Sequence, residues 1–193
     1  MNIEVSLIYI ITINIIAFVL YYTYNKFTAH KESTFFSAVL LVVSLLGGSL
    51  GVIISSFFFK NHSNKATMLV KVLSLCFLLI QIALFVMFKL KGSGKLNLDF
   101  IGYFSTHNIV LIYLGIINVI TFIAFGIDKR LAVKHRSRVP IATLFALSFI
   151  GGSIGGLLAM RTFRHKTRKS YFTLGIPTII IMQIVLIVVL MNL

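Results

Sequence analysis

The sequence is poor in the residues that build enzyme and metal sites. It has one cysteine, Cys76, which lies inside an apolar run, so a disulfide framework and a set of thiolate ligands are both excluded. Only four residues are acidic, and no paired carboxylates, no Ser-His-acid set and no metal-binding cluster can be drawn. Walker, HExxH and nucleotide-binding glycine motifs do not occur. We therefore expect no cofactor, no metal and no catalytic residue.

Charge is also scarce, whereas apolar residues dominate. The chain is 59% hydrophobic and 11% charged over 193 residues, more apolar surface than a soluble domain of this length can cover. Six apolar segments of about 18 to 26 residues are each long enough to cross roughly 30 Å of hydrocarbon as a helix. They are residues 7–24, 34–59, 67–90, 107–127, 139–163 and 170–193. Because continuous apolar runs fit helices rather than barrel strands, the expected fold class is an all-α integral membrane protein.

The first segment differs from a signal peptide. Only Glu4 precedes its apolar run, no small-residue cleavage site follows, and the cations Lys26 and Lys31 come afterwards. This order is typical of a retained helix whose N-terminus lies outside.

Polar and glycine landmarks recur along the chain at a nearly constant offset, from 102 to 104 positions. The first set is Tyr9, Asn14, Asn25, Lys26, Gly47, Gly48, Ser49, Gly51, Phe59, Lys60, Lys65 and Gln81. Its matches are Tyr113, Asn118, Asp128, Lys129, Gly151, Gly152, Ser153, Gly155, Phe163, Arg164, Lys169 and Gln183. The sequence therefore predicts two tandem repeats of three hydrophobic segments, residues 1–91 and 107–193, joined by a linker over 92–106.

The middle segment of each repeat carries a glycine cluster near its centre: Gly47, Gly48 and Gly51, then Gly151, Gly152 and Gly155. Two interpretations stay open. The glycines can break the helix so that the segment re-enters on the side it came from, which protein must then cover. Their small-xxx-small spacing also suits a continuous helix that packs closely and crosses with tilt.

The distribution of positive charge separates these alternatives. If all six segments cross, the 18 lysines and arginines divide ten against eight between the two sides. If the middle segments re-enter, fifteen lie on one side and three on the other, which the positive-inside rule favours.

The string FRHKTRK (163–169), together with Asp128-Lys129, Pro140, Gly151-Gly152-Ser153 and LGIP (174–177), resembles the YsdA-like bacterial membrane proteins, the family called domain of unknown function 1294. The resemblance covers roughly residues 110 to 190 and implies a multi-pass protein of the bacterial inner membrane. It implies no activity. Ile141 stands where the family tends to carry an acid, and residues 60–65 have lost the basic string, so an intact site is expected only in the second repeat.

The candidate site residues of the second repeat are mostly cations. We expect anion or headgroup binding by Lys129, Arg130, Arg161, Arg164, His165, Lys166, Arg168 and Lys169. These cations can act as an orientation anchor that touches lipid phosphates, or they can form a pocket for a phosphate-bearing headgroup or anionic solute. No aromatic stacking platform is interleaved with them, so the expected partners are the bilayer and its anionic headgroups, not nucleic acid. A monomer or a homodimer is expected.

The other polar residues have two readings as well. Asp128 either orients the loops by pairing with a neighbouring cation or acts in coupling, with His165 as the possible proton-handling partner. Asn14, Asn118, Gln81 and Gln183 fit interhelical hydrogen bonds or a polar cavity wall.

Two functional hypotheses follow. In the first, the repeats enclose a site near the glycine breaks that binds or moves an anionic amphiphile or solute. In the second, the protein is a membrane anchor or scaffold that contacts anionic lipid or a partner protein.

Overall fold

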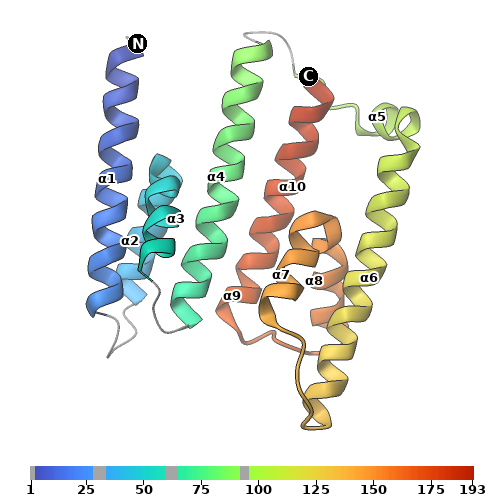
Figure 1. The fold of residues 1–193 in the computed structure, drawn as a ribbon. Helices are drawn as coiled ribbons and strands as arrows, with labels where there is room; N and C mark the ends of the chain where they lie inside the picture. Colours follow the sequence, from blue (N-terminus) through green and yellow to red (C-terminus); the bar gives the residue numbers. More distant parts are fainter. Residues whose placement is uncertain (1–2, 28–33, 60–64, 92–95) are drawn as a thin grey trace. The chain divides into compact units, whose positions relative to one another are not determined.

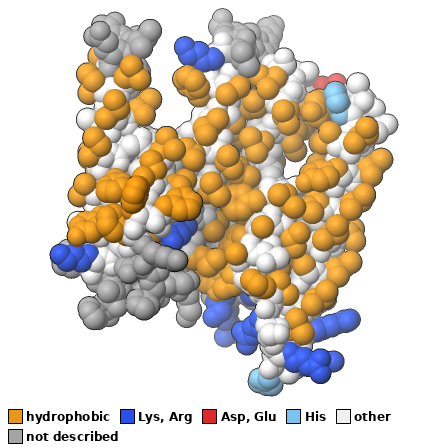
Figure 2. Space-filling model, viewed as in Figure 1, with side chains coloured by type: hydrophobic (Ala, Val, Ile, Leu, Met, Phe, Trp, Pro, Cys, Tyr) orange, Lys and Arg blue, Asp and Glu red, His pale blue; other side chains and the backbone are white. Residues whose placement is uncertain are grey.

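The computed structural model describes residues 3–27, 34–59, 65–91 and 96–193, which are helices and their connections. Six helical segments are long and apolar enough to cross a membrane, so the expected all-α, multi-pass architecture is confirmed. They are Leu7–Lys26, Phe35–Phe58, Met68–Lys89, Asn108–Val133, Ile141–Thr162 and Ser170–Asn192. Hydrophobic side chains cover the flanks of these helices (Figure 2). Lys31 and Lys60, which count among the fifteen cations on one side if the middle segments re-enter, lie outside the described residues.

The chain forms two compact units, Met1–Ile82 and Ala83–Leu193, which we call unit 1 and unit 2. Unit 1 contains α1 (Ile3–Phe27), α2 (Thr34–Val43), the turn η1 (Ser44–Gly48), α3 (Ser49–Phe58) and most of α4 (Lys65–Lys91). Unit 2 contains the end of α4, α5 (Phe100–Thr106), α6 (Asn108–Val133), α7 (Ile141–Leu147), the turn η2 (Ser148–Gly152), α8 (Ser153–Thr162), α9 (Ser170–Thr173) and α10 (Gly175–Asn192). The division falls inside α4, ahead of the expected boundary at residue 91. The short helix α5 lies inside the expected linker, capped by the Asp99 carboxylate, which accepts a hydrogen bond from the Gly102 amide at 2.9 Å.

The middle segment of each unit is interrupted at one glycine. Gly47 has φ 119° and ψ −4°, and Gly151 has φ 129° and ψ −9°. An L side chain rarely adopts this backbone conformation, which glycine reaches freely. The chain therefore ends one helix and starts another at these positions.

In unit 2, α8 runs beside α6 in the same direction (Figure 1). The Gly155 amide at the start of α8 donates to Asn118 Oδ1 at 2.6 Å, near the middle of α6. The Phe163 ring, after the end of α8, lies 5.1 Å from the Phe122 ring, one turn further along α6. Since the chain enters the segment near the end of α6 and α8 returns toward that end, α7, η2 and α8 form a hairpin.

Asp128, near the end of α6, closes this hairpin. The Val139 amide, just before α7, donates to Asp128 Oδ1 at 3.1 Å. His165, just after α8, donates from Nε2 to Asp128 Oδ2 at 2.8 Å. Both ends of the segment thus meet at one carboxylate, and the continuous helix is not the form that the chain takes.

Unit 1 has the same arrangement. The Gly51 amide donates to Asn14 Oδ1 at 2.8 Å, and the Phe59 carbonyl accepts from Asn25 Nδ2 at 3.2 Å, near the end of α1. Leu40 of α2 packs with the buried side chains of the second half of α1. The segment therefore rises along α1 to about its middle and returns.

Candidate functional site

The turns at the two hairpin tips are the places where a ligand was expected. A helix that ends leaves its last four carbonyls without intrahelical partners, and in an apolar surrounding each needs a donor. In unit 1 three side chains supply these donors. The bonds run from Gln81 Nε2 to the carbonyls of Ser44 (2.9 Å) and Leu45 (3.1 Å), from the Tyr9 hydroxyl to Leu46 (2.8 Å) and from Asn14 Nδ2 to Gly47 (3.0 Å).

Unit 2 repeats this pattern bond for bond. The bonds run from Gln183 Nε2 to the carbonyls of Ser148 (2.6 Å) and Phe149 (3.2 Å), from the Tyr113 hydroxyl to Ile150 (2.6 Å) and from Asn118 Nδ2 to Gly151 (3.0 Å). Ser49 and Ser153 complete the two networks by donating to the glutamine carbonyl oxygens. The interhelical reading of Asn14, Asn118, Gln81 and Gln183 therefore describes their contacts.

The glycine clusters serve the close approach of helices as well as the turn. A Cβ at Gly51 would overlap the Asn14 carbonyl, and one at Gly155 would overlap the Asn118 carbonyl. Gly152 has the same relation to the Thr121 hydroxyl, and Gly48 lies against Ala17. Side chains of each unit already donate to the carbonyls of residues 44–47 and 148–151. None of these eight carbonyls is therefore left free to bind a ligand.

The buried carboxylate of Asp128 organises the other end of unit 2. Its side chain is 0% exposed. Besides Val139 and His165, it pairs with Lys166, whose Nζ lies 2.8 Å from Oδ2. A buried carboxylate is tolerated when it is paired and hydrogen-bonded in this way. Of the two readings of Asp128, orienting or coupling, these contacts fit the orienting one.

Lys166 is enclosed by the same cluster. Its Nζ lies 4.6 Å from the centre of the Phe172 ring, in reach of a cation–π interaction. Burial lowers the pKa of Lys166 below its ordinary value, and the neighbouring Arg138 adds to this effect, although the bond to Asp128 opposes it. Of the cations of the FRHKTRK string, Lys166 and His165 therefore face inward.

The remaining cations of the string face outward. Arg164 and Lys166 both have left-handed φ values, 46° and 62°, which turn the chain sharply on either side of His165. Arg164, Arg168 and Lys169 are exposed, and so is Arg161 near the end of α8. The eight expected cations therefore do not form one pocket.

Lys129 and Arg130 belong to a separate feature that the sequence analysis missed. A hollow of about 270 Å³ lies between the last turns of α6 and the end of α8. It is lined by Phe122, Ile123, Gly126, Ile127, Lys129, Arg130 and Phe163. A second hollow, of about 210 Å³, is lined by Asn118, Val119, Phe122, Ile154, Gly155 and Leu158. The two hollows share Phe122, and we call them together the α6–α8 groove.

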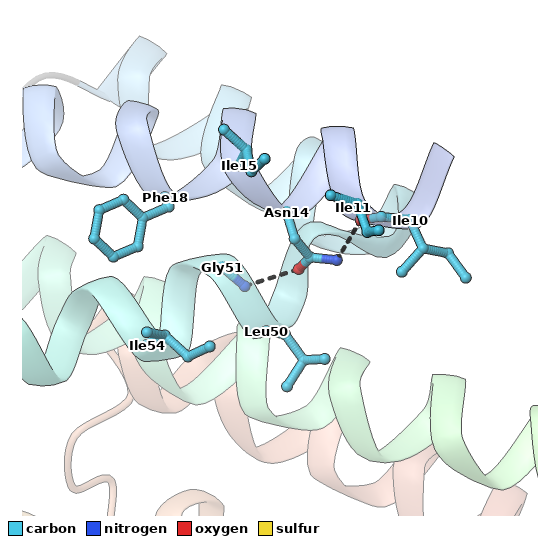
Figure 3. A pocket seen from close by; sticks show the side chains of 8 residues that line it. All are labelled: Ile10, Ile11, Asn14, Ile15, Phe18, Leu50, Gly51 and Ile54. Atoms are coloured by element: carbon cyan, nitrogen blue, oxygen red, sulfur yellow. Dashed lines mark hydrogen bonds between the residues drawn. The ribbon is translucent and has the colours of Figure 1, made fainter. Parts of the chain in front are cut away.

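Unit 1 has a related hollow of about 390 Å³ between α1 and α3 (Figure 3). It is lined by Ile10, Ile11, Asn14, Ile15, Phe18, Leu50, Gly51 and Ile54. Six of these residues lie 104 positions before a residue that lines the second hollow of unit 2. Figure 3 shows the Asn14 amide at the floor of this hollow, bonded to Gly51.

The constant spacing of 104 corrects one match made from the sequence. Asn14 and Asn118 have the same role, and the buried residues Tyr21 and Phe125 follow at the same spacing. At the same spacing, the residue of unit 1 that matches Asp128 is Tyr24 and not Asn25. Tyr24 is buried, as Asp128 is. A one-residue shift was invisible in the sequence because both repeats place a lysine soon afterwards. Unit 1 therefore carries a tyrosine where unit 2 carries its buried acid.

The stretch that matches a family model lies within unit 2. Residues 118–172 match the family described as "Protein of unknown function (DUF1294)". Over 81 residues the chain is 37% identical to "Uncharacterized protein YsdA" from Bacillus subtilis (strain 168), an alignment that covers 42% of this chain and 91% of that relative. No solved structure matches the chain. The family match includes Asp128, the whole hairpin and the FRHKTRK string.

Proposed function

Because this chain belongs to the DUF1294 family, whose description assigns no function, we propose one from its geometry: a non-enzymatic membrane protein that binds anionic phospholipid headgroups through one end of unit 2. The observation that carries this proposal is the closure of the hairpin at Asp128. Since Val139 and His165 bond to the same carboxylate, the loop before α7 and the turn after α8 lie at the same end of the unit.

That end of unit 2 is strongly cationic. Figure 2 shows Lys and Arg side chains gathered there. We call the following exposed residues the cationic end: Arg130, Lys134, Arg136, Arg138, Arg161, Arg164, Arg168 and Lys169. Each cation near an anionic leaflet contributes roughly 1 kcal/mol of attraction. Arginine also bonds two phosphate oxygens at once, so a phosphate-bearing headgroup suits this set.

This proposal keeps the binding part of the first hypothesis and the lipid contact of the second. Transport through broken helices depends on half-helix ends that face the solute. Here the freed carbonyls of both breaks accept bonds from tyrosine, asparagine and glutamine, which favours fixed hairpins. The matched bonds of the two turns also support our inference that unit 1 and unit 2 arose by duplication.

The proposal is tested by thermal unfolding of the purified protein in detergent. Added phosphatidylglycerol should raise the midpoint more than added phosphatidylcholine, and salt should reduce the difference. Replacing Arg161, Arg164, Arg168 and Lys169 by alanine should roughly halve the excess, because it removes four of the eight exposed cations. Lys89→Ala, at the far end of α4, is the control and should leave the excess unchanged. Equal stabilisation of the unsubstituted protein by the two lipids would refute the proposal.

A further inference from the structure

We infer that the α6–α8 groove holds one molecule of an anionic diacyl phospholipid, with an acyl chain in the apolar hollows and the phosphate at Lys129 and Arg130. This inference rests on the proposed function, and it adds a single stoichiometric site to the general attraction of the cationic end. The site lies within unit 2.

The groove has the polarity of an amphiphile. Asn118, Phe122, Gly126 and Arg130 recur at intervals of four residues and so share one face of α6. Along this face the two hollows have apolar walls, which end at Lys129 and Arg130. A hydrocarbon chain that lies in the hollows would therefore bring its headgroup to two cations.

The walls of the groove are open on the outside of the unit. Ile123, Ile154 and Leu158 are 53%, 55% and 53% exposed. In a membrane protein such side chains face lipid, so a lipid molecule enters from the side without crossing the unit. Gly126 and Gly155 have no side chain to fill the groove. A Cβ at Gly126 would already lie 3.2 Å from the Phe163 ring.

In unit 1 an aromatic side chain stands at the position that matches Gly126. At the spacing of 104, Tyr22 stands in the place of Gly126 and Phe59 in the place of Phe163. The Tyr22 ring lies 4.7 Å from the Phe59 ring, in the position that corresponds to the cationic hollow of unit 2. Unit 1 therefore places an aromatic ring at the position that a glycine leaves open in unit 2.

The two cations at the end of the groove are not neutralised by the acid beside them. Asp128 accepts a hydrogen bond from His165 and forms its ion pair with Lys166, on the buried side of α6. Lys129 is half-buried and Arg130 is exposed. A half-buried ammonium beside an exposed guanidinium suits a phosphodiester at the boundary between hydrocarbon and water.

Native mass spectrometry of the full chain with added phosphatidylglycerol tests the site. The unsubstituted protein should retain one lipid. Gly126→Tyr, which copies the arrangement of unit 1, should lose it. Lys129→Ala combined with Arg130→Ala should weaken it about thirtyfold, the conversion of roughly 1 kcal/mol for each of two cations. Lys134→Ala combined with Arg136→Ala removes two exposed cations outside the groove and should retain the lipid.

Two further results make the test decisive. If Gly126→Tyr does not fold, the double variant of Lys129 and Arg130 decides the test, and an affinity for the lipid equal to that of the unsubstituted protein overturns the inference. Competition by free glycerol 3-phosphate at equal concentration would also overturn it, because the apolar hollows would then contribute nothing. The variant that lacks Arg161, Arg164, Arg168 and Lys169 should keep the single lipid, so loss of general headgroup attraction and loss of the groove site are distinguishable.

Discussion

At the residue scale, Asp128 joins three segments that are distant in the sequence. Its carboxylate receives the amide of Val139, the imidazole of His165 and the ammonium of Lys166. The sequence showed this acid among cations, which left an orienting role and a coupling role as alternatives. It could not indicate that two of the cations turn inward, because this depends on the left-handed backbone at Arg164 and Lys166.

Replacing Asp128 by asparagine should destabilise unit 2 strongly. The change leaves the Lys166 ammonium, only 12% exposed, without its counter-ion, and breaking a buried pair costs about 3 kcal/mol. The free energy of unfolding in mixed micelles measures the loss. Lys166→Met added to this variant should recover part of it, since the uncompensated charge is then removed. The exposed control Lys169→Ala should change the free energy of unfolding by no more than about 0.5 kcal/mol. If Asp128→Asn lowered it by no more than this control, the closing role of the Asp128 carboxylate would be contradicted.

At the element scale, the hairpin is a helix that the chain interrupts and then repairs with side chains. Glycine breaks and polar residues in apolar helices were both visible in the sequence, and so were their matched positions. Their connection was not visible, because it requires Gln183 of α10 and Tyr113 of α6 to reach carbonyls of the same turn. The groove was also missed. The sequence signal for the groove was Gly126, which matches Tyr22 of the first repeat at the spacing of 104.

Gly151→Ala tests the hairpin turn. Alanine at φ 129° is strained, and such a residue costs about 1 to 3 kcal/mol. A Cβ would also lie 3.0 Å from the Ile117 side chain. The midpoint of thermal unfolding should therefore fall. Gly115→Ala in the middle of α6 is the matched control: a Cβ there meets nothing within 4 Å, so the midpoint should stay or rise. An equal response of the two variants would show that the turn is not required.

At the scale of the whole molecule, the question is how a chain with six apolar segments meets a bilayer. Two of the six segments are hairpins whose ends meet within their own unit, so we propose that α1, α4, α6 and α10 cross and that the hairpins re-enter. With this arrangement fifteen of the 18 lysines and arginines lie on one side, which the positive-inside rule assigns to the cytoplasm. The family membership expected from the FRHKTRK string is confirmed.

Cysteine labelling distinguishes four crossings from six. In a Cys76→Ala background, single cysteines replace Ser137 before α7, Thr167 after α8 and Ser105 before α6, all three of them exposed. A membrane-impermeant maleimide applied to intact cells should label position 105 alone, and positions 137 and 167 only after permeabilisation. The reason is that α6, with 26 residues, spans about 39 Å between position 105 and the other two. If positions 137 and 167 reacted from opposite sides, the hairpin of unit 2 would cross the bilayer. The cationic end would then be divided between two leaflets, and neither the proposed headgroup surface nor its charge count would hold.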